Sequence, residues 1–172
     1  MSKLPCGCLL LSIIIKSTWT PPFLKLQGLE DGVSSSGIVK LIFLEGGAGS
    51  FPRVASALQA ETLAVLRSLQ RAAELEMTRL VIETDAATVG RALRSTDLDR
   101  SPNGCLFSQI REFMMSQFIH CFVSVCPRSC NMVADSLVGH GCTLEEGSCM
   151  YMSHAPDFVL ALVSGDLPRA SE

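Results

Sequence analysis

Three acidic residues of the chain stand at places where their carboxylates could share a bound cation. They are Glu61, Asp85 and Asp135. Carboxylates, together with waters and phosphate oxygens, are the ligands that Mg²⁺ prefers in proteins. Two such ions, about 3.5–4 Å apart, stabilise the attacking and the leaving oxygen of a phosphodiester cleavage. The three residues therefore predict a metal site suited to phosphodiester hydrolysis, provided that the fold brings them together.

Glu61 lies in a helix predicted over residues 56–76. At 100° per residue, it falls at the centre of an apolar stripe that includes Leu58, Val65 and Ala72. Such a stripe faces the core of a protein, and burying an unpaired carboxylate there costs several kcal/mol. Glu61 therefore needs a partner or a metal. The alternative is that it rests at the edge of the core, near the helix start, and interacts with the helix dipole.

Asp85 and Asp135 each have a functional and a structural interpretation. Asp85 follows a strand predicted over residues 80–84, and open α/β sheets bind their ligands at the carboxyl ends of strands. The alternative for Asp85 is a helix N-cap, where Asp is also common. Asp135 lies in a short helix predicted over residues 131–138, on the side away from Val133 and Leu137. Its alternative is an ordinary solvated helix residue.

The elements that must position these residues follow from apolar patterns and turn signals. A β-hairpin is predicted from strands at residues 23–29 and 38–44. A glycine-rich loop at residues 46–49 follows, and a third strand, if present, must be short and lie within residues 48–54.

A capping box formed by Ser56 and Gln59 marks the start of the first long helix. After the strand at residues 80–84, the pattern predicts a helix over residues 86–94, a helix opened by Ser101 and Pro102, a strand over residues 118–125 and the helix at residues 131–138. This order predicts a mixed α/β fold with one sheet covered by helices.

Composition limits the possible classes of protein. The chain has 172 residues, of which 48% are hydrophobic, and a formal charge of −3 from 14 basic and 17 acidic residues. Disordered chains combine few apolar residues with a high net charge, so this chain is expected to fold. Domains that bind DNA by charge alone usually have a pI above about 9, whereas the pI here is about 5.6. Bound Mg²⁺ would add local positive charge and attract a phosphate backbone all the same.

Eight cysteines suggest disulfides or a structural zinc site, but no pair has the CxxC spacing of such a zinc site. The spacing favours reduced thiols in an intracellular protein, in the nucleus or the cytoplasm. An apolar run at residues 9–15 looks like the core of a secretion signal. It is shorter than the roughly 20 residues of a membrane span, and no convincing cleavage site follows. We therefore expect neither secretion nor a membrane partner.

Three segments, taken together, resemble one known family. They are Ala60-Glu61, Val81-Ile-Glu-Thr-Asp85, and Cys126-Pro-Arg-Ser-Cys-Asn131-Met-Val-Ala-Asp135-Ser-Leu137. Their order and spacing resemble the ribonuclease H-like domain (ribonuclease H type 1) of plant proteins related to retrotransposon reverse transcriptases, most clearly over residues 53–140. The resemblance implies a ribonuclease H-like fold with a mixed central sheet: an N-terminal antiparallel hairpin, then parallel strands, flanked by helices.

The resemblance also implies metal-dependent endonucleolytic hydrolysis of RNA in RNA–DNA hybrids, with two Mg²⁺ (or Mn²⁺) ions as cofactors. Glu61, Asp85 and Asp135 match three of the family's four metal-binding carboxylates. Asp31 is the candidate for the fourth, although it comes two residues later than in the family pattern. Either a bulge restores its position, or the site lacks its bridging ligand. In the second case the chain is a catalytically degenerate nucleic-acid-binding or protein-interaction domain.

The resemblance also assigns roles to positions other than the metal ligands. Arg128 and Asn131 are the candidate substrate-binding residues. The position of the histidine that assists proton transfer in many ribonucleases H is taken by Val125. Losing a general acid or base typically costs about 10²–10⁴-fold in rate, so slow cleavage could survive without it. Arg67 and Arg71, about one helical turn apart, either contact phosphates or form a solvated helix face.

The resulting layout is an N-terminal extension at residues 1–20, a ribonuclease H-like domain at residues 21–142 and a C-terminal tail at residues 143–172. The predicted partner is nucleic acid, as an RNA–DNA hybrid, with no obligate protein partner. The single Trp and the single Tyr lie outside the matching region, so no aromatic platform for single strands is predicted.

Overall fold

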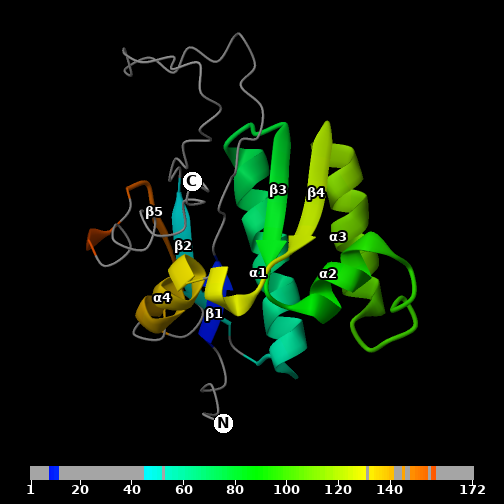
Figure 1. Cartoon of the computed structure of the whole chain (residues 1–172), viewed down its shortest axis with the longest axis horizontal. Coiled ribbons are helices and arrows are strands. Elements are labelled where there is room, and N and C mark those ends of the chain that lie inside the picture. The colour runs from blue at the N-terminus through cyan, green and yellow to red at the C-terminus, as the bar shows by residue number, and fades with distance from the viewer. Residues whose placement is uncertain are drawn as a thin grey trace, which may run out of the picture.

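The computed structural model of the chain has a small antiparallel sheet beside a parallel pair of strands (Figure 1). It describes residues 8–11, 45–51, 53–130, 132–141, 145, 148–154 and 156–157. β1, β2 and β5 form the antiparallel sheet, and β3 and β4 form the parallel pair. In chain order, the elements are β1 (Cys8–Leu11), β2 (Gly46–Ser50), α1 (Ala57–Glu74), β3 (Arg79–Thr84), α2 (Ala87–Arg94), α3 (Gly104–Gln117), β4 (His120–Val125), the 3₁₀ turn η1 (Arg128–Cys130), α4 (Met132–Gly141) and β5 (Cys149–Met152).

α1 begins where its capping box predicts. The Ser56 hydroxyl accepts a hydrogen bond from the Gln59 backbone N–H at 3.1 Å, and the Gln59 side chain accepts one from the Ala55 N–H at 2.6 Å. The first bond satisfies a donor that the start of a helix leaves without a helical partner, and the second attaches the Gln59 side chain to the residue before the cap. The helix ends at Glu74, and Glu76 then adopts a left-handed conformation with φ of 56°. That turn leads the chain into β3.

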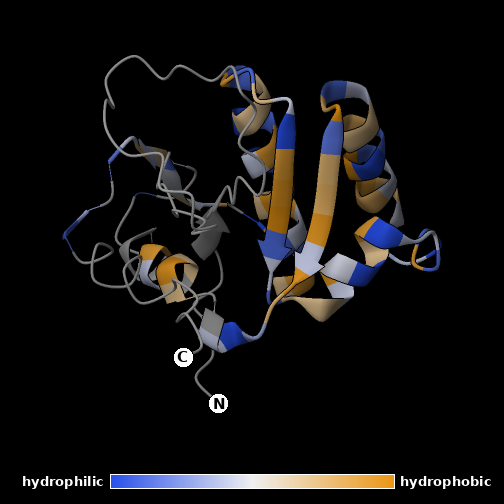
Figure 2. Cartoon of the chain, turned by 45° about the horizontal axis from the view of Figure 1, so that its top comes forward, coloured by the Kyte–Doolittle hydropathy of each residue, from blue (hydrophilic) through white to orange (hydrophobic). Residues whose placement is uncertain are grey.

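β3 and β4 confirm the strands predicted around residues 80–84 and 118–125. They run in parallel, with Leu80 level with Cys121. Their inner face packs on a core built from α1, α2 and α3, which includes Leu69, Val89, Phe107 and Ile110. Figure 2 shows that both strands begin at a hydrophilic residue and continue into a hydrophobic stretch. The side chains of Arg79, Val81, Glu83, His120 and Phe122 belong to the opposite face, called the outer face below.

Arg111 and Gly104 fix the position of α3 relative to α2 and to the loop between them. The Arg111 guanidinium donates to the carbonyl oxygens of Ala92 and Ser95 at 2.7 and 3.1 Å, and pairs with Asp99 at 2.6 Å. It thereby satisfies carbonyls at the C-terminal end of α2, which lack helical partners. Gly104 opens α3 against the backbone of Asp99, where a Cβ atom would collide. The helix therefore begins slightly later than its proline signal predicts.

β2 is a strand of glycine, alanine and serine. Gly49 stands between Leu9 of β1 and Cys149 of β5, both in antiparallel register. A Cβ atom on Gly49 would lie 2.5 Å from the Cys149 sulfur, so glycine allows an approach that other residues would obstruct. The loop predicted at residues 46–49 is therefore wrong, because the third strand begins at Gly46. In the sequence these glycines suggest a loop, but in the structure they make room for the neighbouring strand β5.

The predicted hairpin strands at residues 23–29 and 38–44 lie outside the described residues. β1 comes from the predicted N-terminal extension and packs against α1 and α4. The α/β class is confirmed, with antiparallel strands and a parallel pair flanked by helices. Within the described ranges the strands form two sheets rather than one. No helix in the described part of the chain is long and apolar enough to cross a membrane.

Candidate active site

One end of the parallel pair collects residues that the sequence singles out. Because β3 and β4 are parallel, their carboxyl ends lie at the same edge, and the beginning of α1 lies near this edge (Figure 1). Asp85 directly follows β3, Arg128 opens η1 shortly after β4, and Glu61 lies in the second turn of α1. Three separate stretches of sequence therefore meet at one edge.

The pKa of the Glu61 carboxyl is affected by the charges of both Asp85 and Arg128. It is raised above its ordinary value, first by partial burial of the carboxyl group and then by the negative charge of Asp85. The positive charge of Arg128 acts in the opposite direction and lowers the pKa. Glu61 is thus within electrostatic reach of both residues. Two carboxylates that repel each other at one site are stabilised by a cation between them.

Glu61 lies on the packed side of α1, as the stripe predicts, yet its side chain is exposed. Ala64, Leu69 and Ala72, further along the helix, are buried. The structure therefore agrees with the edge-of-core alternative for burial: the helix start extends past the core, so Glu61 escapes full burial. Protein atoms still crowd its carboxyl group enough to raise the pKa.

Asp85 is not the N-cap of the following helix. That position belongs to Ala86, which makes no side-chain cap hydrogen bond. The Thr84 hydroxyl instead accepts a hydrogen bond from the Ala86 N–H at 3.1 Å. The N-cap alternative for Asp85 is therefore not observed. Asp85 is half-buried, and its negative charge raises the pKa of the Glu61 carboxyl.

The remaining predicted ligands are only partly described. α4 confirms the predicted last helix, and Val133 and Leu137 are buried as expected. The backbone of Asp135 lies in this helix, while its side chain is outside the description. Asp31 and Asn131 also lie outside the described residues.

The donor set suits a hard cation. Within the described residues, no group of three or more His, Cys, Asp or Glu side chains is arranged to hold a metal ion. Glu61 and Asp85 are two of the four predicted ligands, whereas Asp31 and the side chain of Asp135 lie outside the described residues. An all-oxygen pair with mutual repulsion fits Mg²⁺ or Mn²⁺ better than softer metals.

Arg71 has a structural role that the sequence did not reveal. Its guanidinium forms two hydrogen bonds with Glu45, at 2.7 and 2.8 Å, and one with Glu74 at 2.9 Å. It also lies over the ring of Tyr151, 4.9 Å from the centroid. The two acidic partners raise the pKa of Arg71. Glu45 precedes β2 and Tyr151 lies in β5, so Arg71 attaches α1 to the antiparallel sheet instead of facing a phosphate.

Arg67 makes more exposed contacts: a hydrogen bond to Gln70 at 3.2 Å and a position 5.9 Å from the Phe51 ring centroid.

Val125, at the family's histidine position, packs against Gly90 of α2, where a Cβ atom would collide with it. His120 opens β4, at the opposite end of that strand from Arg128. His120 therefore does not replace the missing proton-transfer group, and the side chain of His140 in α4 lies outside the described residues.

Comparison with known proteins identifies a family for this chain. The sequence profile of a family described as reverse transcriptase-like matches residues 40–141, more than half of the chain. The match spans β2 to α4 and contains Glu61, Asp85, Arg128, Asn131 and Asp135. No curated protein matches the chain.

Proposed function

Because the chain belongs to the reverse transcriptase-like family, and is therefore a ribonuclease H-like nucleic-acid-binding domain, we propose that it hydrolyses the RNA strand of RNA–DNA hybrids. The observation that carries this proposal is the electrostatic coupling of Glu61 and Asp85 at the carboxyl edge of β3. Two neighbouring carboxylates repel each other, and a cation bound by both would relieve that repulsion.

In this proposal Glu61, Asp85 and Asp135 hold Mg²⁺ or Mn²⁺, with Asp31 as the fourth ligand. When bound, two such ions supply charge stabilisation to the attacking and the leaving oxygen of phosphodiester cleavage. Arg128 balances the carboxylates and, with Asn131, orients the phosphate. Contacts to the 2′-hydroxyl would select RNA over DNA. Because Val125 replaces the family's histidine, proton transfer relies on solvent, and we expect turnover to be slow.

The motifs around Glu61, Asp85 and Asp135 support a finer assignment to the type 1 domains of plant, retrotransposon-related proteins. An RNA–DNA hybrid as substrate further implies action inside the cell, in the nucleus or the cytoplasm.

Cleavage of a labelled RNA–DNA hybrid, with Mg²⁺ or Mn²⁺, tests the proposal. We expect Asp85→Asn to reduce the cleavage rate by at least about 10²-fold, since one metal ligand loses its charge. Asp97→Asn is the matched control, because Asp97 is an exposed acid in the turns after α2, and it should cleave like the wild type. Equal rates for Asp85→Asn and the wild type would refute the assignment of Asp85.

A second function, nucleic-acid binding without cleavage, is favoured by one observation. β1 packs against both α1 and α4, yet its sequence, Cys8-Leu-Leu-Leu11, contains no acidic residue. Because β1 supplies no carboxylate, Asp31 is the remaining candidate for the fourth ligand. Under this alternative, the wild type binds the hybrid but releases no product, and Asp31→Asn changes neither property.

A further inference from the structure

The outer face of the parallel pair carries two aromatic rings that the proposed hydrolysis does not use. His120 and Phe122 are neighbours on this face of β4, and their ring planes lie within 9° of parallel, with centroids 6.2 Å apart. Phe122 is 63% exposed, and His120 is exposed as well. Two nearly parallel rings on β4 are therefore accessible from solvent.

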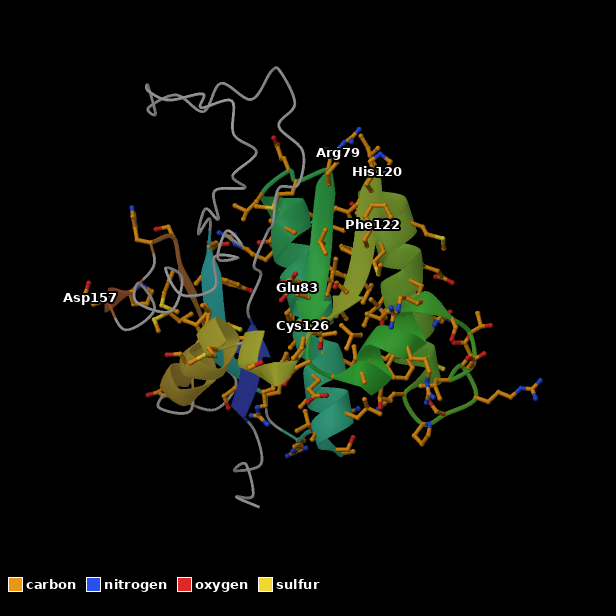
Figure 3. All side chains as sticks on the ribbon, in the orientation of Figure 1. Arg79, Glu83, His120, Phe122, Cys126 and Asp157 are labelled. Atoms are coloured by element: carbon orange, nitrogen blue, oxygen red, sulfur yellow. The ribbon has the colours of Figure 1, made fainter. Side chains whose placement is uncertain are left out.

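A cation accompanies the rings. Arg79 of β3 is the register partner of His120, and Val81 is that of Phe122. Figure 3 shows Arg79 beside His120 at the start of the two strands, with Phe122 further along β4. Aromatic rings and arginine planes are the side chains on which the bases of single-stranded nucleic acids stack. β4 contains no acidic residue that would repel a phosphate backbone, and Glu83 lies toward the far end of the outer face.

The outer face continues into the candidate active site. Asp85 lies four residues beyond Val81, the register partner of Phe122, which is about 13 Å at the rise of a parallel strand. A stacked nucleic-acid strand advances about 3.4 Å per nucleotide. A base on Phe122 would therefore be about four nucleotides from a phosphate at Asp85.

We propose that Arg79, His120 and Phe122 form a stacking platform for a single-stranded RNA segment that continues from the hybrid at the active site. The inference rests on the nucleic-acid function proposed above. RNA is the occupant that fits best, because parallel rings beside a guanidinium match the base and the phosphate of a nucleotide, and because the face leads to carboxylates suited to phosphodiester chemistry.

Binding of a fluorescently labelled oligouridine RNA to the full chain, measured by anisotropy in EDTA, tests this platform without any metal or cleavage. We expect Phe122→Ala to weaken binding about 5- to 100-fold, the usual effect of removing one stacking ring. Phe122→Tyr should retain the wild-type affinity, because it keeps the ring. Ile119→Ala is the matched control: Ile119 is 67% exposed, slightly more than Phe122, but has no ring, and its replacement should leave the affinity unchanged.

Three results would overturn the platform. The first is no oligouridine binding by the wild type. The second is an equal loss of affinity in Ile119→Ala, which would indicate a general apolar contact. The third is unchanged RNA affinity in Phe122→Ala, and a change of molecular mass in light scattering for that variant would then indicate pairing with a second copy. Hybrid cleavage by wild type and Asp85→Asn is measured separately, so failure of hydrolysis and failure of the platform remain distinguishable.

Discussion

The parallel pair β3–β4 and the antiparallel sheet β1–β2–β5 are stabilised by different interactions. The parallel pair lies on a contiguous core in which Leu69, Phe107 and Ile110 are almost completely buried. The antiparallel sheet depends on close approach at Gly49 and on the ion pair between Arg71 and Glu45. The stability of an apolar core is spread over many small contacts, whereas a bidentate ion pair and a glycine contact depend on a few particular atoms. The two regions should therefore respond differently to chemical modification and to mutation.

Thiol reactivity gives the largest expected contrast, because each region contains a free cysteine in a strand. Burial raises the pKa of Cys121 in β4 to about 12, whereas Cys149 in β5 is exposed. The thiolate is the reactive form, so at pH 8 only about one Cys121 in 10⁴ is reactive. We expect iodoacetamide to label Cys121 about 10³-fold more slowly than an exposed thiol such as Cys149, as measured by mass spectrometry of peptides.

The pH dependence gives this prediction its sign. Because the folded-state pKa of Cys121 is raised, its labelling rate should rise about tenfold per pH unit above pH 8, until the fold opens. Similar labelling rates for the two thiols at pH 8 would mean that β4 is no better packed than β5.

Removing Arg71 should affect chiefly the antiparallel sheet. Arg71→Ala leaves the Glu45 carboxylate, whose side chain is only 11% exposed, without its bidentate partner. An uncompensated polar group of this kind typically lowers the free energy of unfolding by about 1–3 kcal/mol, which urea denaturation would measure. Hydrogen exchange should accelerate in β2 and β5 more than in β3 and β4.

Arg67→Ala is the control for that change, since its contacts with Gln70 and Phe51 are exposed or distant. It should alter stability by less than about 0.5 kcal/mol. An equal rise of exchange in both sheets of Arg71→Ala would indicate that they unfold as one unit.

The smallest expected effect is a gain in stability from a substitution just after α1. Glu76 holds a left-handed conformation after α1, with its N–H bonded to the Ala73 carbonyl at 2.9 Å. Glycine adopts this conformation without strain, so Glu76→Gly should raise the free energy of unfolding by about 0.5–1 kcal/mol. Glu74→Gly, inside the last helical turn, should lower it by a similar amount. A thermal melt that moves the same way in both variants would contradict this account.

The elements that depend on neighbouring residues were predictable from the sequence. The capping box at Ser56, the apolar strand before Asp85 and the buried pair Val133 and Leu137 all follow from local patterns. The meeting of Glu61 with Asp85 was predictable too, because ligands gather at the carboxyl ends of parallel strands. These signals survive in the structure because the core that they build is contiguous along the chain.

Features that join distant segments were not predictable in the same way. Arg71 is 26 residues from Glu45, and nothing near either residue marks the other as its partner. β2 has the composition of a loop, and its strand conformation depends on β1 and β5, which come from opposite ends of the chain. The rings of His120 and Phe122 lie beside Arg79 only because of the register of β3 and β4. The number of aromatic residues in the chain does not predict that register.

The parallel register of β3 and β4 has a consequence during protein synthesis. β3 leaves the ribosome long before β4, because α2 and α3 separate the two strands in the sequence. β4 itself, His120-Cys-Phe-Val-Ser-Val125, has no acidic, lysine, arginine or proline residue to discourage pairing with other chains. Until the crossover closes, both strands are exposed to aggregation. We therefore expect the yield of folded protein to depend on how quickly α2 and α3 form between them.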